Sequence, residues 1–172
     1  HHGAIEAYTK AIELEPENPF SYSNRGLAKA DLKNYNEAMK DYTKAIELDS
    51  CYFNAYILRG LSKAELLDYQ GAIEDYSKAI ECNPVSYMAY NNRALIKHTL
   101  KDHHGALQDY TITINYGPEL PSVFSNRGNV KTDLQDYRGA HDDFSKAIEL
   151  DSLQCEYYYS RGNASYDLQD YS

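Results

Sequence analysis

Apolar residues recur along the chain at the spacing of an α-helix. In the segment "YNEAMKDYTKAIEL", Ala38, Tyr42, Ala45 and Ile46 stand three or four residues apart from one helical turn to the next. This spacing places them in one stripe on a helix face. That helix is expected over roughly 36–48, and a second helical stretch, roughly 22–32, precedes it. No segment alternates apolar and polar residues with a period of two, so the pattern predicts helices and no strands.

The helix pair returns every 34 residues. "NRG" or a close variant marks the first helix, and phrases such as "KDYTKAIELDS" mark the second. A fixed period of this length is typical of a protein that stacks copies of one structural unit. The arginines of the first phrase are Arg25, Arg59, Arg93, Arg127 and Arg161. We therefore read residues 1–172 as a single array with a trailing half repeat 1–18, full repeats 19–52, 53–86, 87–120 and 121–154, and a leading half repeat 155–172.

The opening "HH" is in phase with this period. His1 and His103 lie three periods apart, and both hold the position that Tyr35 holds in its own repeat. We interpret His1 and His2 as native, and a purification tag that falls in register is the alternative.

The predicted helix ends follow the same period. A short polar residue suited to cap the second helix stands in four of the turns, at Asn34, Asp68, Asp102 and Asp136. One segment departs from the pattern: "TITINYGPELP", residues 111–121, is rich in β-branched residues, glycine and proline. We expect the second helix of that repeat to be the least regular.

A 34-residue helix pair with this pattern resembles the tetratricopeptide repeat family, and the resemblance covers the whole chain. Small residues let two helices approach closely, and a ring in the same stripe fills the space beside them. The family's tryptophan position holds Tyr22, and Lys29 replaces a second aromatic. The resemblance implies an all-α, right-handed superhelical solenoid of stacked antiparallel helix pairs. The matching positions are Gly26, Gly60, Ala94, Gly128 and Gly162 in the first helices, then Ala4, Ala38, Ala72, Ala106 and Ala140 with Tyr8, Tyr42, Tyr76, Tyr110 and Phe144 in the second.

Charge and hydropathy narrow the classes of partner. The net charge is −9, whereas modules that bind nucleic acid usually carry the opposite sign. No apolar run approaches the roughly 20 residues that cross a bilayer. We therefore expect neither a nucleic-acid partner nor a membrane segment.

Three cysteines, Cys51, Cys82 and Cys155, are an odd number without a closely spaced pair. This spacing indicates neither a disulfide framework nor a zinc site. Free thiols are typical of a reducing compartment, so we expect a cytoplasmic location.

The most regular charged column combines Arg25 and Lys29, which share one helix face, with Asp41 in the second helix. We interpret this column as a buried ion-pair network and not as a ladder that grips an acidic ligand, because partly buried charges are normally paired. The repeated tyrosines are interpreted as core rings.

No catalytic, phosphate-binding or zinc motif is present in the sequence. His103 and His104 are adjacent, so on a helix their side chains diverge by about 100° and do not chelate one ion together. We predict no catalytic residue, no metal ligand, no cofactor and no enzymatic activity within these residues.

In tetratricopeptide arrays the first helices line a concave groove that holds an extended peptide or a partner helix. Carried onto this chain, the resemblance gives a groove that is mainly aliphatic in the first three repeats and mainly amide and hydroxyl in the last two. The predicted groove residues are Phe20, Ser23, Asn24, Leu27, Asn54, Ile57, Leu58, Leu61, Met88, Asn91, Asn92, Leu95, Asn126, Asn129, Tyr159 and Asn163.

One subtype of groove does not fit. Arrays that clamp the acidic tail of heat-shock chaperones need cations at fixed groove positions, and in the first possible frame those positions hold Ser23, Met88 and Asn92. The other two frames also lack every required cation. The sequence therefore disfavours a chaperone-tail carboxylate clamp.

The function that follows is a non-catalytic scaffold or adaptor for protein–protein interaction that binds a protein or peptide ligand. Two alternatives stay open: the recruiting segment of a larger enzyme whose catalytic domain lies outside this chain, and a related helical-repeat protein that reads RNA. The two terminal half repeats are complementary, so end-to-end association of separate chains is a further expectation.

Overall fold

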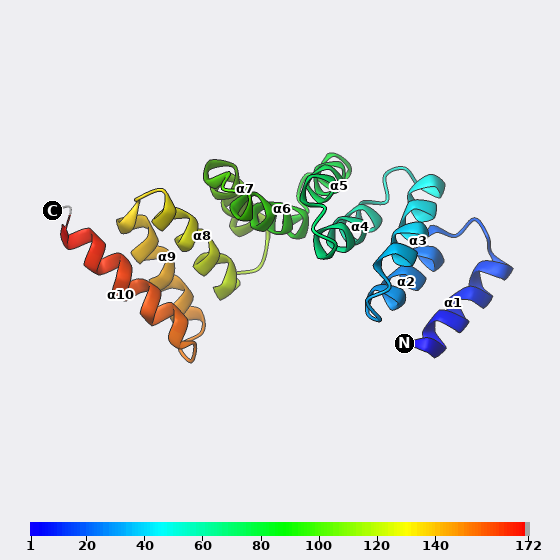
Figure 1. Cartoon of the computed structure of the whole chain (residues 1–172), viewed down its shortest axis with the longest axis horizontal. Helices are drawn as coiled ribbons and strands as arrows, with labels where there is room; N and C mark the ends of the chain where they lie inside the picture. Colours follow the sequence, from blue (N-terminus) through cyan, green and yellow to red (C-terminus); the bar gives the residue numbers. More distant parts are fainter. Residues whose placement is uncertain (171–172) are drawn as a thin grey trace. The chain divides into compact units, whose positions relative to one another are not determined.

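The computed structural model describes residues 1–170, which form ten α-helices and no strand (Figure 1). The last two residues of the predicted half repeat 155–172 lie outside this range. The first helices of successive pairs begin at Pro19, Phe53, Tyr87, Pro121 and Cys155, which reproduces the 34-residue period. The bounds are α1 His2–Leu14, α2 Pro19–Ala30, α3 Tyr35–Leu48, α4 Phe53–Glu65, α5 Tyr69–Cys82, α6 Tyr87–Thr99, α7 His103–Tyr116, α8 Pro121–Asp133, α9 Tyr137–Leu150 and α10 Cys155–Asp170.

The chain forms two compact units, and in each of them the helices pack in chain order. Unit 1, His1–Val85, holds α1 to α5, with α2 also contacting α4. Unit 2 begins at Ser86 and holds α6 to α10, with α8 contacting both α6 and α10. Each unit is therefore a stack of helix pairs, and the predicted all-α repeat solenoid is confirmed.

The centre of a helix pair is a ring packed on a glycine. Tyr42 is fully buried, and a Cβ atom added at Gly26 would lie 2.6 Å from Tyr42 Cε1. The same contact recurs in unit 2, where a Cβ at Gly128 would lie 2.8 Å from Phe144 Cε1. Only a hydrogen atom fits at these glycines, because the ring of the second helix occupies the space. The interpretation of these columns as packing positions is confirmed.

The turn inside each pair closes on a residue in the left-handed region. The Asn34 N–H then donates to the carbonyl of Lys29 at 3.0 Å, which satisfies one of the free carbonyls at the end of α2. Since the same turn recurs in every full repeat, it fixes the antiparallel return of each second helix. The left-handed residues are Lys33 (φ 61°), Leu67 (φ 63°), Lys101 (φ 66°) and Gln135 (φ 61°).

Three of the four predicted caps form. Asp68 Oδ1 accepts a hydrogen bond from the Gly71 N–H at 3.0 Å, and Asp102 and Asp136 make the same bond. The prediction is wrong at Asn34, whose side chain makes no capping bond. A Cβ atom at Gly71 would collide with the Asp68 carboxylate, and the equivalent position after Asn34 is Glu37, which carries one. In all three turns whose cap forms, the residue three positions later is glycine.

The expectation of an irregular second helix in the repeat 87–120 is wrong. α7 has 14 residues, as α5 and α9 do, and is followed directly by Gly117. Buried Thr113 donates its hydroxyl to the Asp109 carbonyl at 2.9 Å, so its polar atom is satisfied inside the helix. Tertiary packing outweighs the weak helix propensity of this segment.

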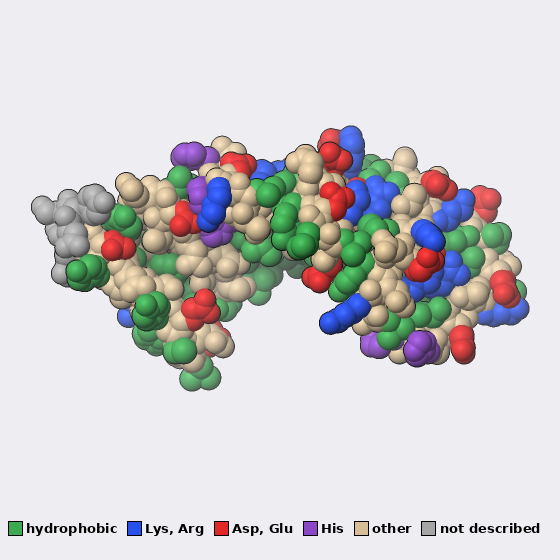
Figure 2. All heavy atoms as spheres, viewed as in Figure 1, with side chains coloured by type: hydrophobic (Ala, Val, Ile, Leu, Met, Phe, Trp, Pro, Cys, Tyr) green, Lys and Arg blue, Asp and Glu red, His purple; other side chains and the backbone are tan. Residues whose placement is uncertain are grey.

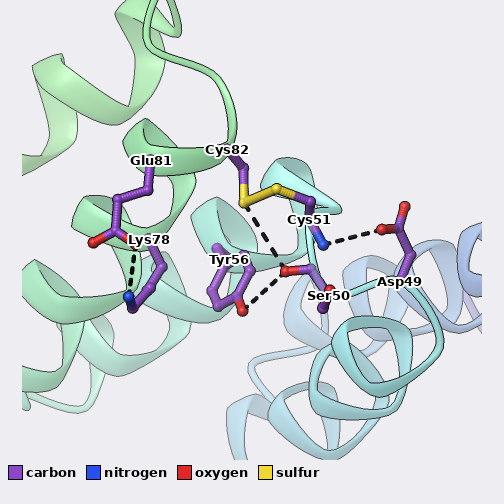
Figure 3. The surroundings of a disulfide bond; sticks show 7 residues. All are labelled: Asp49, Ser50, Cys51, Tyr56, Lys78, Glu81 and Cys82. Carbon is purple, nitrogen blue, oxygen red and sulfur yellow. Dashed lines mark hydrogen bonds and ion pairs between the residues drawn. A yellow bond between two sulfur atoms is a disulfide. The ribbon is translucent and has the colours of Figure 1, made fainter.

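A disulfide joins Cys51, in the loop after α3, to Cys82, the last residue of α5 (Figure 3). The interpretation that the cysteines form no disulfide is wrong. The two residues lie 31 positions apart in sequence, close to one period, so the stacking of pairs brings their Cα atoms to 5.3 Å. Around the bond, the Tyr56 hydroxyl donates to the Ser50 carbonyl at 3.3 Å. The argument for a reducing compartment loses its basis.

No helix in residues 1–170 combines the length and the apolar character that crossing a bilayer requires.

Candidate functional site

The repeated charges form buried ion-pair networks. Arg25 donates from Nη2 to Asp41 Oδ1 at 2.7 Å and from Nε to Oδ2 at 3.0 Å, and Lys29 Nζ lies 2.7 Å from the same Oδ2. This forked pairing raises the pKa of Arg25, chiefly through its hydrogen bonds to Asp41. The interpretation as a structural network is confirmed. The same triad recurs as Arg59, Lys63 and Asp75, as Arg93, Lys97 and Asp109, and as Arg127, Lys131 and Asp143.

The networks of Arg25, Arg59 and Arg127 also connect neighbouring helix pairs within a unit. Arg59 Nη1 donates to Thr43 Oγ1 in the preceding second helix at 3.0 Å. Its guanidinium lies 5.6 Å from the centre of the Tyr56 ring. These arginines are therefore engaged by the fold. Figure 2 shows acidic, basic and hydrophobic side chains interspersed on the face it draws, with no continuous basic area there.

The candidate partner-binding surface consists of the exposed side of the first helices. In unit 1 it lies on α2 and α4, which contact each other. Phe20, Leu27 and Leu61 are exposed large apolar side chains, and Phe20 also meets the ring of Tyr52 edge-on, at 5.0 Å between centres. Asn24 is exposed as well, while Asn54 and Leu58 are half-buried.

Two predicted groove residues of unit 1 are not available to a partner. Ser23 is 1% exposed and Ile57 is 5% exposed, because both point into the packing between helices. The family resemblance placed them in the groove, one residue beside the exposed Asn24 and the half-buried Leu58. We therefore leave these two side chains out of the candidate surface.

In unit 2 the candidate surface lies on α6, α8 and α10. Met88, Leu95 and Tyr159 are exposed, and so is Asn163. The other predicted amides, Asn91, Asn92, Asn126 and Asn129, are half-buried. Asn91 donates through Nδ2 to Asn92 Oδ1 at 3.4 Å, while its own Oδ1 is buried and has no hydrogen-bond partner. This half of the surface therefore pairs apolar anchors with amides.

Sequence reasoning missed one constellation. The structure brings His98, His103 and Asp133 of unit 2 together, although in the sequence the only histidine next to His103 is His104. The signal that could have found it is the period: His103 lies 30 residues before Asp133, as Tyr35 lies 30 residues before Glu65.

Comparison with known proteins gives matches to one family. One family model described as tetratricopeptide repeat matches residues 19–50. A second model with the same description matches residues 57–114, and together the two take in more than half of the chain. No curated protein matches.

Solved structures match along most of the chain. The crystal structure of MamA is 26% identical with a TM-score of 0.80, covering 90% of this chain and 91% of that one. YrrB, a TPR protein with an unusual peptide-binding site, is 22% identical with a TM-score of 0.84 and coverage of 93% and 82%. A thermophilic TPR protein in Thermus thermophilus is 14% identical, with a TM-score of 0.72 and coverage of 93% and 88%. The last two likenesses show the fold alone.

Proposed function

The chain belongs to the tetratricopeptide repeat family, and from that premise we propose that it is a non-catalytic scaffold that holds an extended peptide or a partner helix on its first helices. The observation that carries the proposal is the contrast between two sets of columns. The repeated rings pack in the core, and the repeated charges form ion pairs with each other. Large apolar side chains on the first helices, such as Phe20, Leu61 and Leu95, are left exposed.

The two parts of the surface suit two parts of a ligand. Leu27 and Leu61 in unit 1 offer anchors for apolar side chains of a peptide or of a helix face. In unit 2 the amides of Asn91, Asn92 and Asn126 can each donate to and accept from a peptide main chain. A neighbour in structure, YrrB, supports the proposal because it has a peptide-binding site.

The proposed ligand is not an acidic tail. The arginines and lysines of α2, α4, α6 and α8 that belong to the repeated triads are already paired with aspartates, for example Arg59 and Lys63 with Asp75. A carboxylate ligand would compete with a buried carboxylate that is held by two cations, which is unfavourable. The proposed recognition therefore rests on apolar contact and amide hydrogen bonds.

Leu61→Asp and Asn92→Ala test the proposal. Peptides selected from a random displayed library against the intact chain would be labelled, and their Kd measured by fluorescence anisotropy. We expect each variant to raise Kd about tenfold or more, since buried anchors at the centre of an interface dominate affinity. Leu153→Asp is the matched control, because Leu153 is exposed in the loop before α10.

Unchanged Kd in both variants, or an equal loss in Leu153→Asp, would contradict the proposed surface. Circular dichroism of each variant would establish that the helices are retained, so that a loss of affinity reports the contact and not the fold.

A further inference from the structure

Three potential metal ligands from three helices meet in unit 2. His98 lies in the last turn of α6, His103 is the first residue of α7, and Asp133 is the last residue of α8. His98 Nε2 lies 2.7 Å from Asp133 Oδ2, and His103 Nδ1 lies 3.4 Å from the same oxygen. One ligand atom of each residue lies within 4.8 Å of the other two. The three ligand atoms therefore lie close enough together to share one ion.

The fold holds these residues in place. The turn between α6 and α7 closes at Lys101, whose φ of 66° brings the start of α7 back beside the end of α6. The two imidazole rings consequently meet edge-on, with centres 5.5 Å apart. α8 packs on both α6 and α7, and this packing brings its final residue to the pair. A ligand set that spans three mutually packed helices is preorganised.

The equivalent positions in unit 1 show which part of the cluster belongs to every repeat and which part does not. The equivalents of His98, His103 and Asp133, two periods earlier, are Ala30, Tyr35 and Glu65. There the Tyr35 hydroxyl donates to Glu65 Oε2 at 3.3 Å. The contact between an aromatic residue and an acid is thus part of the repeat. An imidazole at the His103 position also occurs in unit 1, where His1 Nδ1 lies 3.1 Å from Asp31 Oδ2. The second imidazole, His98, is particular to the cluster in unit 2.

One atom of the cluster is unsatisfied in the fold. His103 Nδ1 is buried and makes no hydrogen bond, although Asp133 Oδ2 lies 3.4 Å away. Buried polar atoms without a hydrogen-bond partner are rare in native proteins, so we infer that this nitrogen binds a ligand. The lone pair of a neutral imidazole is the donor that a transition metal takes.

We propose that His98 Nε2, His103 Nδ1 and Asp133 Oδ2 bind a zinc ion. Two imidazoles and one carboxylate are a donor set that zinc accepts with three protein ligands and one open position. Bonds of about 2.0–2.2 Å in a tetrahedron put the ligand atoms about 3.3–3.6 Å apart. The present 3.4 Å between His103 and Asp133 already matches that value, and the 2.7 Å contact would lengthen as the metal replaces the shared proton.

The surroundings favour a cation and leave it accessible. Asp133 and His98 stand at the carboxyl ends of their helices, where the helix dipole attracts positive charge. The Asp133 side chain is 41% exposed, so solvent reaches the fourth position. Bound zinc would link the turn after α6 to the end of α8 and so tie two consecutive helix pairs of unit 2 together.

Zinc titration of the full chain tests the proposal. The chain would be stripped with a chelator, and Zn²⁺ affinity measured in competition with a chromophoric chelator. We expect one site whose affinity falls more than about tenfold in each of His98→Ala, His103→Tyr and Asp133→Asn. Alanine and tyrosine are the residues that unit 1 carries at the first two positions, so these variants keep the repeat fold. Zn²⁺ should also raise the Tm of the chain, and the three variants should lose that rise.

The remaining histidines serve as internal controls. His1, His2, His104 and His141 are present in every cluster variant, and His141→Ala on its own should leave affinity unchanged because His141 contacts only Asp142 among the charged partners in the described residues. Zinc affinity of the chain equal to that of the double variant His98→Ala with His103→Tyr would overturn the proposal. An equal loss in His141→Ala would do the same. In either case the three residues form a hydrogen-bonded cluster only.

Discussion

Tyr35 in unit 1 and His103 in unit 2 hold the same position of the repeat and meet the same kind of partner, an acid at the end of a first helix. In unit 1 the result is a hydrogen bond to Glu65 at the surface. In unit 2 a second imidazole, His98, joins the contact and makes a candidate zinc site. Unit 1 in turn carries the disulfide between Cys51 and Cys82. The same repeated packing positions therefore build both units, while the positions that do not take part in packing carry different chemistry in each unit.

This comparison predicts that removing an equivalent core ring lowers the free energy of unfolding by the same amount in both units. Tyr76→Ala in unit 1 and Tyr110→Ala in unit 2 remove rings that are almost fully buried. Each should lower the free energy of unfolding by about 4 kcal/mol, because a cavity replaces the ring. Urea unfolding would measure the loss, and hydrogen exchange with mass spectrometry would localise it to the unit concerned. A loss confined to one of the two variants would break the equivalence of the units.

The disulfide should stabilise unit 1 alone. Cys51→Ser with Cys82→Ser should lower the free energy of unfolding of that unit by about 3 kcal/mol, since a cross-link over 31 residues restricts the unfolded chain. Cys155→Ser is the control, because Cys155 is a free, exposed cysteine. Faster hydrogen exchange in α4 and α5 of the double variant would support this assignment, whereas identical urea midpoints for all three proteins would contradict it.

The smallest effect concerns the ring hydroxyl. Burial raises the pKa of Tyr110 above its usual value near 10. The folded state therefore keeps the proton that the unfolded chain releases, so stability is fully present below about pH 10 and falls as the pH rises further. Tyr110→Phe should make this alkaline loss shallower. At neutral pH it should be neutral or stabilising by up to about 1 kcal/mol, because the hydroxyl is buried without a hydrogen bond.

Phe144, which fills the equivalent position of the next repeat, shows that a phenyl ring fits there. Exposed Tyr159→Phe is the control for the alkaline titration. A steeper alkaline loss in Tyr110→Phe than in the parent chain would reverse the expected sign.

The fold was predictable because stacking imposes its demands at every period. Ala38, Tyr42 and Gly26 recur for one physical reason, close approach of two helices beside a ring, so five copies reveal it without any relative for comparison. The ion pair of Arg25 with Asp41 was predictable for the same reason. Local propensity was the weaker guide, as the regular helix α7 demonstrates.

The candidate surface and the special sites were less predictable. The family resemblance gives the groove face only to within about one residue, which is why Ser23 and Ile57 were assigned to the groove although both are buried. The disulfide and the histidine cluster depend on contacts between residues about one period apart. A search for closely spaced motifs does not connect Cys51 with Cys82, yet stacking makes them neighbours.

The arginine that reaches backward has a mechanical consequence. Arg59 hydrogen-bonds to Thr43 in the preceding helix pair and to Asp75 in its own pair. The packing of one helix pair therefore depends on the order of the pair before it. Loss of one such contact therefore lowers the stability of the adjoining helix pairs most, and the effect decreases with distance along the stack. On heating, we therefore expect the helix pairs next to a weakened contact to unfold first and the most distant pairs to unfold last.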